Sequence, residues 1–597
     1  MDLLIHNGKI TTLNPRQPEV NALSVIDGRV AAIGTNDDIL AMAPTHGKRI
    51  DLKGRRVVPG LNDSHLHFIR EGLFYNLELR WDGIASIDEA LRRLKEQAQR
   101  TPAPQWVRVI GGWSEWQFRE GRMPTLEEIN KAAPDTPVFV LHLYDCAILN
   151  RAALQALGMD SNTPNPPGGL IARDASGHPT GLLIAEPNAL ILYAAIAQAP
   201  KLSFEDQLNS SRQYMRELNR FGITSVSDAG GGGQNYPDDY AVVQKLADDG
   251  QLTIRVAYSL FAQKPGLELD DYRRWLGLTK PGEGNEFLRV NGGGENLVWS
   301  AADFENFLQP RPDLRPVMEN ELEAVLRELV MHRWPFRIHA TYEESIRRFL
   351  NIIERVNRDV PFNGLRWFLD HAETISDESI ARVAALQGGI AIQHRMAYQG
   401  EYFIRRYGKP AVDDRPPIHR MLGAGVPVGA GTDGTRVASY HPWTCLSWLV
   451  SGKTVGGTVI TSPANRLTRE EALRRYTEGS AWFSGEDEIK GTLSPGRYAD
   501  FAILNKDYFS APEHEIRGIE SVLTVLAGRI VYGAQEYAAE DPGLPPVSPD
   551  WSPAGRWGGY VNDPYAQEER VGAHHEHIPI MGADGRLWGA GCYCGTF

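Results

Sequence analysis

Short apolar runs alternate with amphipathic stretches through the middle of the chain. Each run is rich in Val, Ile and Phe and has the length of a buried parallel strand, whereas stretches such as 319–333 and 376–387 have the period of a helix. With the apolar run that ends at Pro59 and Gly60, we expect eight strands, and eight strand–helix units predict an α/β fold, a closed (β/α)8 TIM barrel. The other seven runs lie at residues 221–230, 252–260, 287–295, 335–340, 365–372, 388–394 and 426–433.

The two ends of the chain carry a different pattern. Residues 1–56 are short β-forming runs joined by Asn-Gly, Asp-Gly and Lys-Gly turns, which is the signature of hairpins. The same pattern returns in residues 491–539, where Gly528 separates two apolar runs. We therefore predict a small β-sandwich built from both termini, with the barrel at residues 57–490 between its two parts.

Residues 68–221 are too many for one connection between a strand and a helix. They include the strand-like segment 136–145 and a Pro/Gly-rich turn at 162–181, so we predict an inserted subdomain after the first barrel strand, lying over the barrel mouth. Its aromatic residues either line an apolar substrate pocket or form the core of the insert itself. These residues are Trp113, Trp116, Phe118 and Tyr144.

Residues that bind metals or move protons recur where the predicted strands end. His65 and His67 are two positions apart, so on an extended strand both imidazoles project from one face and can coordinate one metal ion. Because the strands of a barrel end at one rim, we expect the other such residues to converge there. The set is His65, His67, Glu295, His339, His371, His394 and Asp433.

Composition narrows the class of partner. The formal net charge of -13 argues against a nucleic-acid or anionic-membrane partner, and no apolar run approaches the roughly 20 residues that span a bilayer. Cysteines are too few and scattered for a disulfide framework, and the first residues show no signal-peptide pattern, so we expect a cytoplasmic protein. A homodimer is left open. The cysteines are Cys146, Cys445, Cys592 and Cys594.

A group of motifs adds a resemblance to these patterns. The motifs are VVPGLNDSHLHF, GITSVSDAG, FLDHAETIS, GAGTDGT, LTREEALRRYTEGSA and GTLSPGRYADFAIL, with GGW and PPGGLIARDASGHPTG in the insert. Together they resemble the amidohydrolase superfamily and, within it, the YtcJ-like branch, amidohydrolase family 3, which includes N-substituted formamide deformylases. The similarity covers about residues 1–533 and is far more specific for fold than for substrate.

This resemblance implies a metal-dependent hydrolase that cleaves a non-peptide C–N bond of a small-molecule amide or N-substituted formamide. It implies ligands from the first strand (His65 and His67), the fifth and sixth strands (His339 and His371) and the eighth strand (Asp433). Asp433 is then the expected acceptor of a proton from water and its later donor to the leaving nitrogen. The expected cofactor is one or two divalent metal ions, with zinc as the first candidate.

The chain also departs from the family pattern. Many relatives carry a lysine on the fourth strand that bridges two metals, but the segment LRVNGGGENL has none. Glu295 stands at or next to that position and either bridges two ions or leaves a single-metal site. Two further alternatives stay open: a deaminase that attacks an amidine-like ring carbon, and a catalytically silent metal-binding protein.

Other residues are expected near the substrate. The resemblance draws Glu186 towards the barrel mouth, although a solvated or helix-capping role is an alternative, and Gln393 and His394 are expected to orient the substrate, with Trp113 in the pocket wall. Residues 540–597 form a Pro/Gly/Trp-rich tail, which we interpret as an extended arm packed over the barrel or a neighbouring subunit. A second zinc site is the alternative there, made of His574, His575, His577, Cys592 and Cys594.

Overall fold

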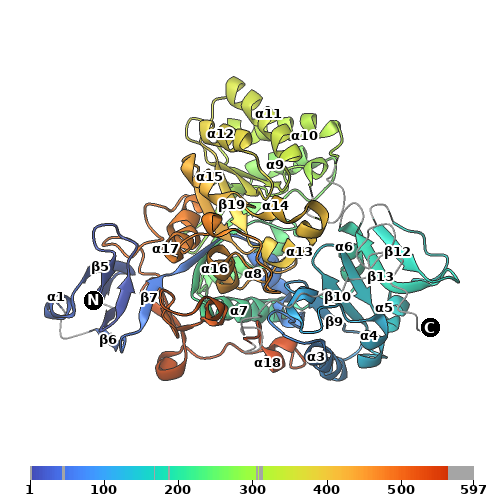
Figure 1. Ribbon diagram of the computed structural model, residues 1–597, viewed down its shortest axis with the longest axis horizontal. Coiled ribbons are helices and arrows are strands. Elements are labelled where there is room, and N and C mark those ends of the chain that lie inside the picture. Colours follow the sequence, from blue (N-terminus) through green and yellow to red (C-terminus); the bar gives the residue numbers. More distant parts are fainter. Residues whose placement is uncertain are drawn as a thin grey trace.

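An eight-stranded parallel sheet forms the centre of the molecule (Figure 1). The computed structural model describes residues 3–42, 47–166, 169–185, 189–303, 307 and 313–562. The strands of the central sheet follow one another in chain order, and each neighbouring pair is parallel, as repeated strand–helix units require. They are β8 (Leu61–Leu66), β14 (Ile223–Asp228), β15 (Arg255–Leu260), β16 (Leu288–Gly293), β17 (Phe336–Ala340), β18 (Trp367–His371), β19 (Gly389–Gln393) and β20 (Val428–Gly431).

The first and last strands of this sheet meet through residues at their ends. The Thr432 amide donates to the carboxylate of Asp63, and the Asp433 amide donates to the carbonyl of His65 at 2.9 Å. The Tyr476 hydroxyl also donates to the buried Asp63 carboxylate, at 2.6 Å. These contacts nearly close the sheet into a cylinder and confirm the predicted (β/α)8 barrel.

The first barrel strand begins later than the sequence pattern indicated. Residues 57–59, which we placed in the barrel, belong to β7 (Arg56–Pro59), a strand of a terminal sheet. The chain enters β8 through Gly60, where an added Cβ would lie 2.1 Å from Thr224 Oγ1. Only glycine fits this close approach, so one continuous apolar run is divided between two sheets.

Helices surround the barrel on its outer face. One of them, α11 (Glu343–Asp359), buries Ile346, Phe349 and Ile353 on one side, which is the apolar stripe expected of a helix packed on a sheet. Within the described ranges, none of the helices has both the length and the apolar content to cross a membrane. Other helices of the barrel region are α7 (Phe204–Arg220), α8 (Ala241–Asp248), α9 (Glu268–Leu276), α10 (Val317–Met331), α12 (Asp377–Ala385), α13 (Met396–Tyr407), α14 (Lys409–Val412), α15 (Ile418–Gly423), α16 (Pro442–Ser451) and α17 (Arg469–Arg474).

Two further sheets are built from the termini, as predicted. The first has the strand order β5-β4-β1-β6 and the second β23-β22-β21-β7-β2-β3, so the second joins both ends of the chain. Their facing sides share one apolar core that includes Leu3, Ile5, Phe501 and Val525. The bounds are β1 (Leu3–His6), β2 (Lys9–Thr11), β3 (Glu19–Val20), β4 (Ala22–Ile26), β5 (Arg29–Gly34), α1 (Asn36–Met42), β6 (Lys48–Asp51), β21 (Phe501–Leu504), β22 (Ser521–Leu526) and β23 (Arg529–Gly533).

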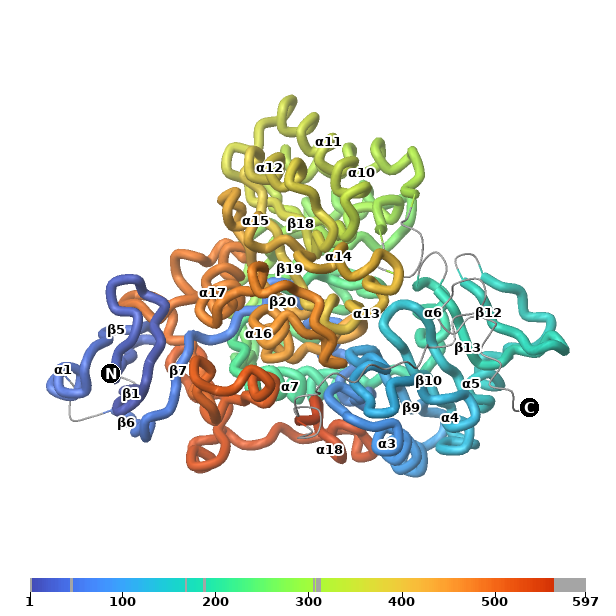
Figure 2. The backbone as a smooth tube through the Cα atoms, in the orientation of Figure 1, coloured from blue at the N-terminus to red at the C-terminus, as the bar shows by residue number. Residues whose placement is uncertain are grey.

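The segment between β8 and β14 forms its own mixed five-stranded sheet, in the order β12-β13-β11-β10-β9. Apolar cores lie on both sides of this sheet. Figure 2 shows the insert and the terminal sheets on opposite sides of the barrel. The elements are α2 (Phe68–Phe74), α3 (Ile87–Arg100), β9 (Val107–Ile110), α4 (Leu126–Ala132), β10 (Val138–His142), β11 (Cys146–Leu149), α5 (Arg151–Ala156), β12 (Gly169–Arg173), β13 (Pro179–Ala185) and α6 (Leu190–Ile196).

The described part of the C-terminal arm, which carries α18 (Pro553–Trp557), packs on its own chain. The Ser552 hydroxyl donates to the Asn76 carbonyl at 2.7 Å, and the Tyr560 ring stacks on His441 with centroids 3.8 Å apart. These contacts tie the arm to the insert and to the barrel. The histidines and cysteines considered for a second zinc site lie outside the described residues.

Candidate metal centre

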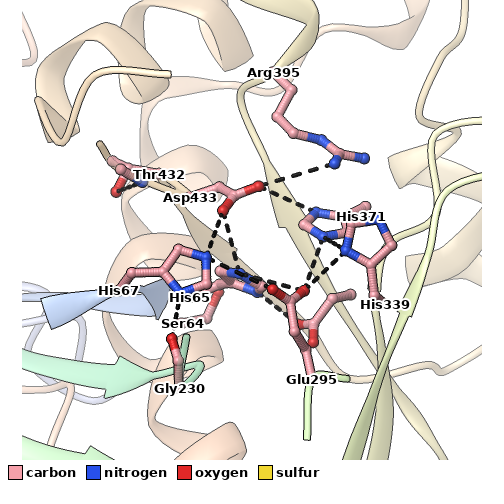
Figure 3. A network of polar contacts seen from close by, with 12 residues as sticks. Ser64, His65, His67, Gly230, Glu295, His339, His371, Arg395, Thr432 and Asp433 are labelled. Atoms are coloured by element: carbon pink, nitrogen blue, oxygen red, sulfur yellow. Dashed lines mark hydrogen bonds and ion pairs between the residues drawn. The ribbon is translucent and has the colours of Figure 1, made fainter. Parts of the chain in front are cut away.

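Six side chains meet at the rim where the barrel strands end. Figure 3 shows the carboxylates of Glu295 and Asp433 between one pair of histidines at the end of β8, His65 and His67, and another pair on β17 and β18. Parallel strands point their carboxyl ends to one side of a barrel, which explains how residues up to 368 positions apart come together. We call this set the barrel cluster: His65, His67, Glu295, His339, His371 and Asp433.

Glu295 occupies the middle of the barrel cluster. Its Oε2 atom lies 3.0 Å from His339 Nδ1 and 3.3 Å from His371 Nε2, while Oε1 lies 3.6 Å from His67 Nε2. Ligand atoms around one tetrahedral zinc ion are about 3.4 Å apart, given metal–ligand bonds near 2.1 Å. The glutamate therefore faces both histidine pairs at the spacing of metal ligands.

Asp433 faces the same space from the other side. Its Oδ1 atom lies 3.2 Å from His67 Nε2 and 3.4 Å from His65 Nε2, and Oδ2 lies 3.8 Å from His371 Nδ1. Arg395, which forms an ion pair with Glu373 at 2.8 Å, reaches to 3.9 Å of Asp433. Three groups of residues can each hold an ion: His65, His67 and Glu295; His65, His371 and Asp433; and Glu295, His339 and His371.

The donor atoms of the barrel cluster suit a divalent cation. His65 Nε2 and His371 Nδ1 are buried and have no hydrogen-bond partner, although buried polar atoms are nearly always satisfied. Although burial disfavours the charged form, the surrounding histidines hold the pKa of Glu295 and the pKa of Asp433 well below their usual values. Two ionised carboxylates beside unsatisfied imidazole nitrogens form a donor set that fits a cation.

The neighbours of His65 orient its ring. Its Nδ1 atom lies 3.0 Å from Asp370 Oδ1, and Asp370 is itself held by Arg337 at 2.6 Å. A carboxylate on Nδ1 directs the Nε2 lone pair towards the cluster, as is usual for metal-binding histidines. Burial opposes protonation, but Asp370 and Glu295 outweigh it and raise the pKa of His65 to about 9.

The other histidines are held differently. The pKa of His67 is lowered by burial and by the nearby Arg70, and burial together with Arg395 lowers the pKa of His371 to about 4, so both rings are neutral at pH 7. His371 and Asp433 have positive φ angles of 80° and 57°. Such backbone is rare in residues other than glycine and is found most often at functional sites.

A cavity of about 260 Å³ opens onto the barrel cluster. His67, Glu295, His339 and Asp433 form one end of its wall. The rest is a mixture of apolar side chains and cations from the insert and the strand-end loops, so a small molecule placed there would lie against the cluster. These further lining residues include Arg70, Ile110, Tyr144, Tyr193, Phe261, Trp299 and Arg436.

Trp113 does not line this cavity. Its side chain is fully buried in the core of the insert, where it packs on Trp81 and donates its indole N–H to the Leu141 carbonyl at 3.0 Å. This placement agrees with the alternative of a core role in the insert, and a contact of Trp113 with the substrate stays a prediction. Among the aromatic residues considered for the pocket, only Tyr144 is part of the cavity wall.

Two residues predicted to orient the substrate lie behind the wall. Gln393 and His394 are buried at the end of β19 and do not line the described cavity, and burial lowers the pKa of His394 to about 3. His394 also belongs to none of the possible metal-binding groups among the described residues. Their contact with substrate stays a prediction, and Glu186 lies outside the described residues.

Several cavity residues were missed by the sequence reasoning. Arg70 is three positions after His67, inside the motif that supplied the first two ligands, and that proximity was an available signal. Tyr193 and Arg436 come from the insert and from the loop after β20, and no local pattern distinguishes them.

Comparison with known proteins agrees with this geometry. A sequence profile of the amidohydrolase family matches residues 48–532. The chain is 28% identical over 556 residues to a putative amidohydrolase, YtcJ, of Bacillus subtilis (strain 168), covering 89% of this chain and 99% of that protein. It is also 25% identical over 548 residues to an N-substituted formamide deformylase of Arthrobacter pascens, covering 89% of this chain and 98% of that protein.

A solved structure has the same fold. An uncharacterized metal-dependent hydrolase from Pyrococcus horikoshii OT3 superposes with a TM-score of 0.62 and 22% sequence identity. The match covers 86% of this chain and 99% of that one. It therefore includes the barrel and the surrounding sheets and not the barrel alone.

Proposed function

The chain belongs to the amidohydrolase family, and from this premise we propose that it hydrolyses a non-peptide C–N bond in a small amide or N-substituted formamide. The observation that carries the proposal is the barrel cluster, in which ionised carboxylates and imidazoles converge beside a cavity. The similarity to an N-substituted formamide deformylase over 89% of the chain supports the choice of bond.

The barrel cluster would hold one or two divalent ions. When bound, such an ion acts as a Lewis acid that polarises a carbonyl group and makes water more acidic. Imidazole and carboxylate donors suit zinc, which is our first candidate, and Glu295 faces both histidine pairs, as a residue shared by two ions must.

Asp433 is the proposed proton carrier. Its pKa, held well below the usual value despite burial by the neighbouring His65 and His67, keeps it ionised and able to accept a proton. The oxygen of a water molecule forms a bond to the amide carbon while Asp433 takes a proton from that water. The C–N bond then breaks, the leaving nitrogen receives this proton, and the products are a carboxylic acid and an amine.

Product analysis with metal-loaded protein tests the proposal. The protein is loaded in turn with zinc, manganese, cobalt and iron(II), and a panel of N-substituted formamides, acetamides and amidine-like heterocycles is assayed for amine, carboxylate and ammonia. We expect amine and carboxylate in equal amounts from at least one amide, and no turnover after chelation. Ammonia release from the heterocycles alone would instead identify a deaminase.

Asp433→Asn provides the matched control for this assay. It keeps the shape of the side chain and an oxygen that faces the histidines, but it cannot accept a proton at neutral pH. If the variant retained both its metal and the parent rate, the proposed role of Asp433 would be wrong.

A further inference from the structure

One arginine in the cavity lies close to the barrel cluster and has no carboxylate partner among the described residues. Arg70 is on α2, three positions after His67, and only 3% of its surface is exposed. It lines the cavity together with His67 and Asp433. Its guanidinium group therefore faces the space in which a substrate at the barrel cluster would lie.

Arg70 lacks a carboxylate among the described residues. No ion pair within 4.0 Å joins it to an Asp or Glu of that part of the chain, and its buried Nη2 atom has no hydrogen-bond partner. Charged groups that are buried to this degree are normally paired, because removing a charge from water is costly. By contrast, Arg80 and Arg337, which are equally buried, pair with Glu71 and Asp370.

The hydroxyl groups of Tyr144 and Tyr193 lie next to Arg70. The Tyr193 hydroxyl donates to the Tyr144 hydroxyl at 2.7 Å, and the guanidinium of Arg436 lies 4.5 Å from the centre of the Tyr193 ring. Both tyrosines and both arginines line the cavity. Together they form a set of donors with a net positive charge.

The charges along the cavity wall also favour an anionic ligand. Beyond the barrel cluster, the described residues of the wall include four cations, Arg70, Arg108, Lys201 and Arg436, against the single carboxylate of Glu78. Burial raises the pKa of Glu78 to about 8, which weakens even that compensation. Apolar side chains such as Ile110 and Phe261 complete the wall.

Resting on the proposed hydrolase function, we propose that Arg70 binds a carboxylate of the substrate, so that the preferred substrates are N-acylated amino acids. The guanidinium fork matches a carboxylate in two parallel hydrogen bonds, and the Tyr144 hydroxyl, which accepts from Tyr193, can donate its own proton to the same oxygens. The acyl C–N bond then faces the barrel cluster, and an apolar side chain of the substrate packs on Ile110 and Phe261.

A matched pair of substrates tests this inference. N-formylphenylalanine, as each enantiomer, is compared with N-formyl-2-phenylethylamine, which has a hydrogen in place of the carboxylate. For the zinc-loaded protein we expect kcat/KM for one enantiomer of the acid to exceed kcat/KM for N-formyl-2-phenylethylamine by about 10–100-fold. This is the range of a charge-assisted hydrogen-bond pair.

Variants separate Arg70 from the general charge of the protein. Arg70→Met should remove the preference, with most of the change in KM, and Arg70→Lys should keep part of it. Arg92→Met, on the exposed side of α3, removes the same charge elsewhere and should leave the preference intact. A preference that survives Arg70→Met in protein of unchanged metal content would overturn the inference.

Calorimetry distinguishes failure of the inference from failure of the proposed function. If the protein hydrolyses neither formyl compound nor any other amide, the proposed function is wrong, and binding alone decides the role of Arg70. In the Asp433→Asn background, binding of N-formylphenylalanine should weaken by about 10–100-fold when Arg70→Met is added. Equal binding with and without Arg70, or no binding to either protein, counts against the carboxylate subsite.

Discussion

Two clusters of buried histidine and carboxylate groups lie in different parts of the molecule. The barrel cluster has Nε2 of His65 and Nε2 of His67 on one oxygen of Asp433, at 3.4 and 3.2 Å. The second cluster, which we call the insert cluster, joins the insert to α13 and consists of Glu115, His142, Asp145 and Tyr402. In it, His142 Nε2 lies 3.2 Å from Glu115 and His142 Nδ1 lies 3.2 Å from Asp145.

The difference between the clusters is one of direction. In the insert cluster the two carboxylates are on opposite edges of one imidazole, so they cannot share an ion with it, and none of these residues lines the described cavity. Despite burial, Asp145 and Glu115 raise the pKa of His142 well above its usual value, so the protonated ring is itself the cation. In the barrel cluster nitrogen atoms of several imidazole rings face one shared space. The same residue types thus form mutually compensating ion pairs in the insert cluster and a set of metal ligands beside a cavity in the barrel cluster.

The largest expected difference in turnover is between two variants that carry the same substitution, His to Gln, one in each cluster. His65→Gln should lose bound metal and activity together, more than the about 10–100-fold cost typical of residues that only support a ligand. His142→Gln should keep its metal and stay within a few-fold of the parent rate. Elemental analysis and kcat/KM of both variants check this, and equal metal loss in both would remove the distinction between the clusters.

Asp433→Asn should act on turnover rather than on binding. Loss of a general acid–base group typically costs about 10²–10⁴-fold, and removal of a step made only in the transition state lowers kcat and kcat/KM together. Steady-state kinetics with measured metal content check the prediction. A variant whose KM rises while kcat is unchanged would make Asp433 a binding residue instead.

Glu295→Gln tests whether the barrel cluster is shared by two ions. A neutral amide is a poor bridge between cations, so the metal-to-protein ratio should fall from about two towards one. Asp433→Asn, which removes a carboxylate from the same cluster, is the matched comparison. An unchanged ratio would assign the chain a single-metal centre.

The smallest effect on turnover is expected from the protonation state of His142 in the insert cluster. That state should instead change the free energy of unfolding. Because the pKa of His142 is raised on folding, its contribution is fully present below the unfolded pKa of about 6.5 and is lost as pH rises through the folded value. Denaturant unfolding across neutral and alkaline pH should show this decline. In His142→Gln the decline should be absent, and breaking the buried pair should cost about 3–5 kcal/mol at pH 6. An unchanged pH profile in the variant would rule out His142 as the titrating group.

The sequence by itself determined the strand content of the barrel and the residues at its rim. The apolar content and length of a buried strand and the 3.6-residue period of a helix are local properties, so the runs that became β14 to β20 were recognisable from their own residues, whereas the first apolar run became β7. His65 and His67 were recognisable for the same reason, since two positions on a strand always share a face. Local pattern also placed Glu295, His339, His371 and Asp433 at strand ends, where parallel strands must bring them to one rim.

Only the tertiary structure decided which polar groups face one another and which are satisfied. Glu115 is paired by Tyr402, 287 positions away, and Trp113 is buried by the strands of the insert, so neither role could be read from neighbouring residues. The same holds for Arg70, for which the described part of the chain supplies no carboxylate partner. Whether a buried charge is compensated depends on contacts between segments far apart in the chain, and these contacts exist only once the strands, the insert and the barrel have packed together.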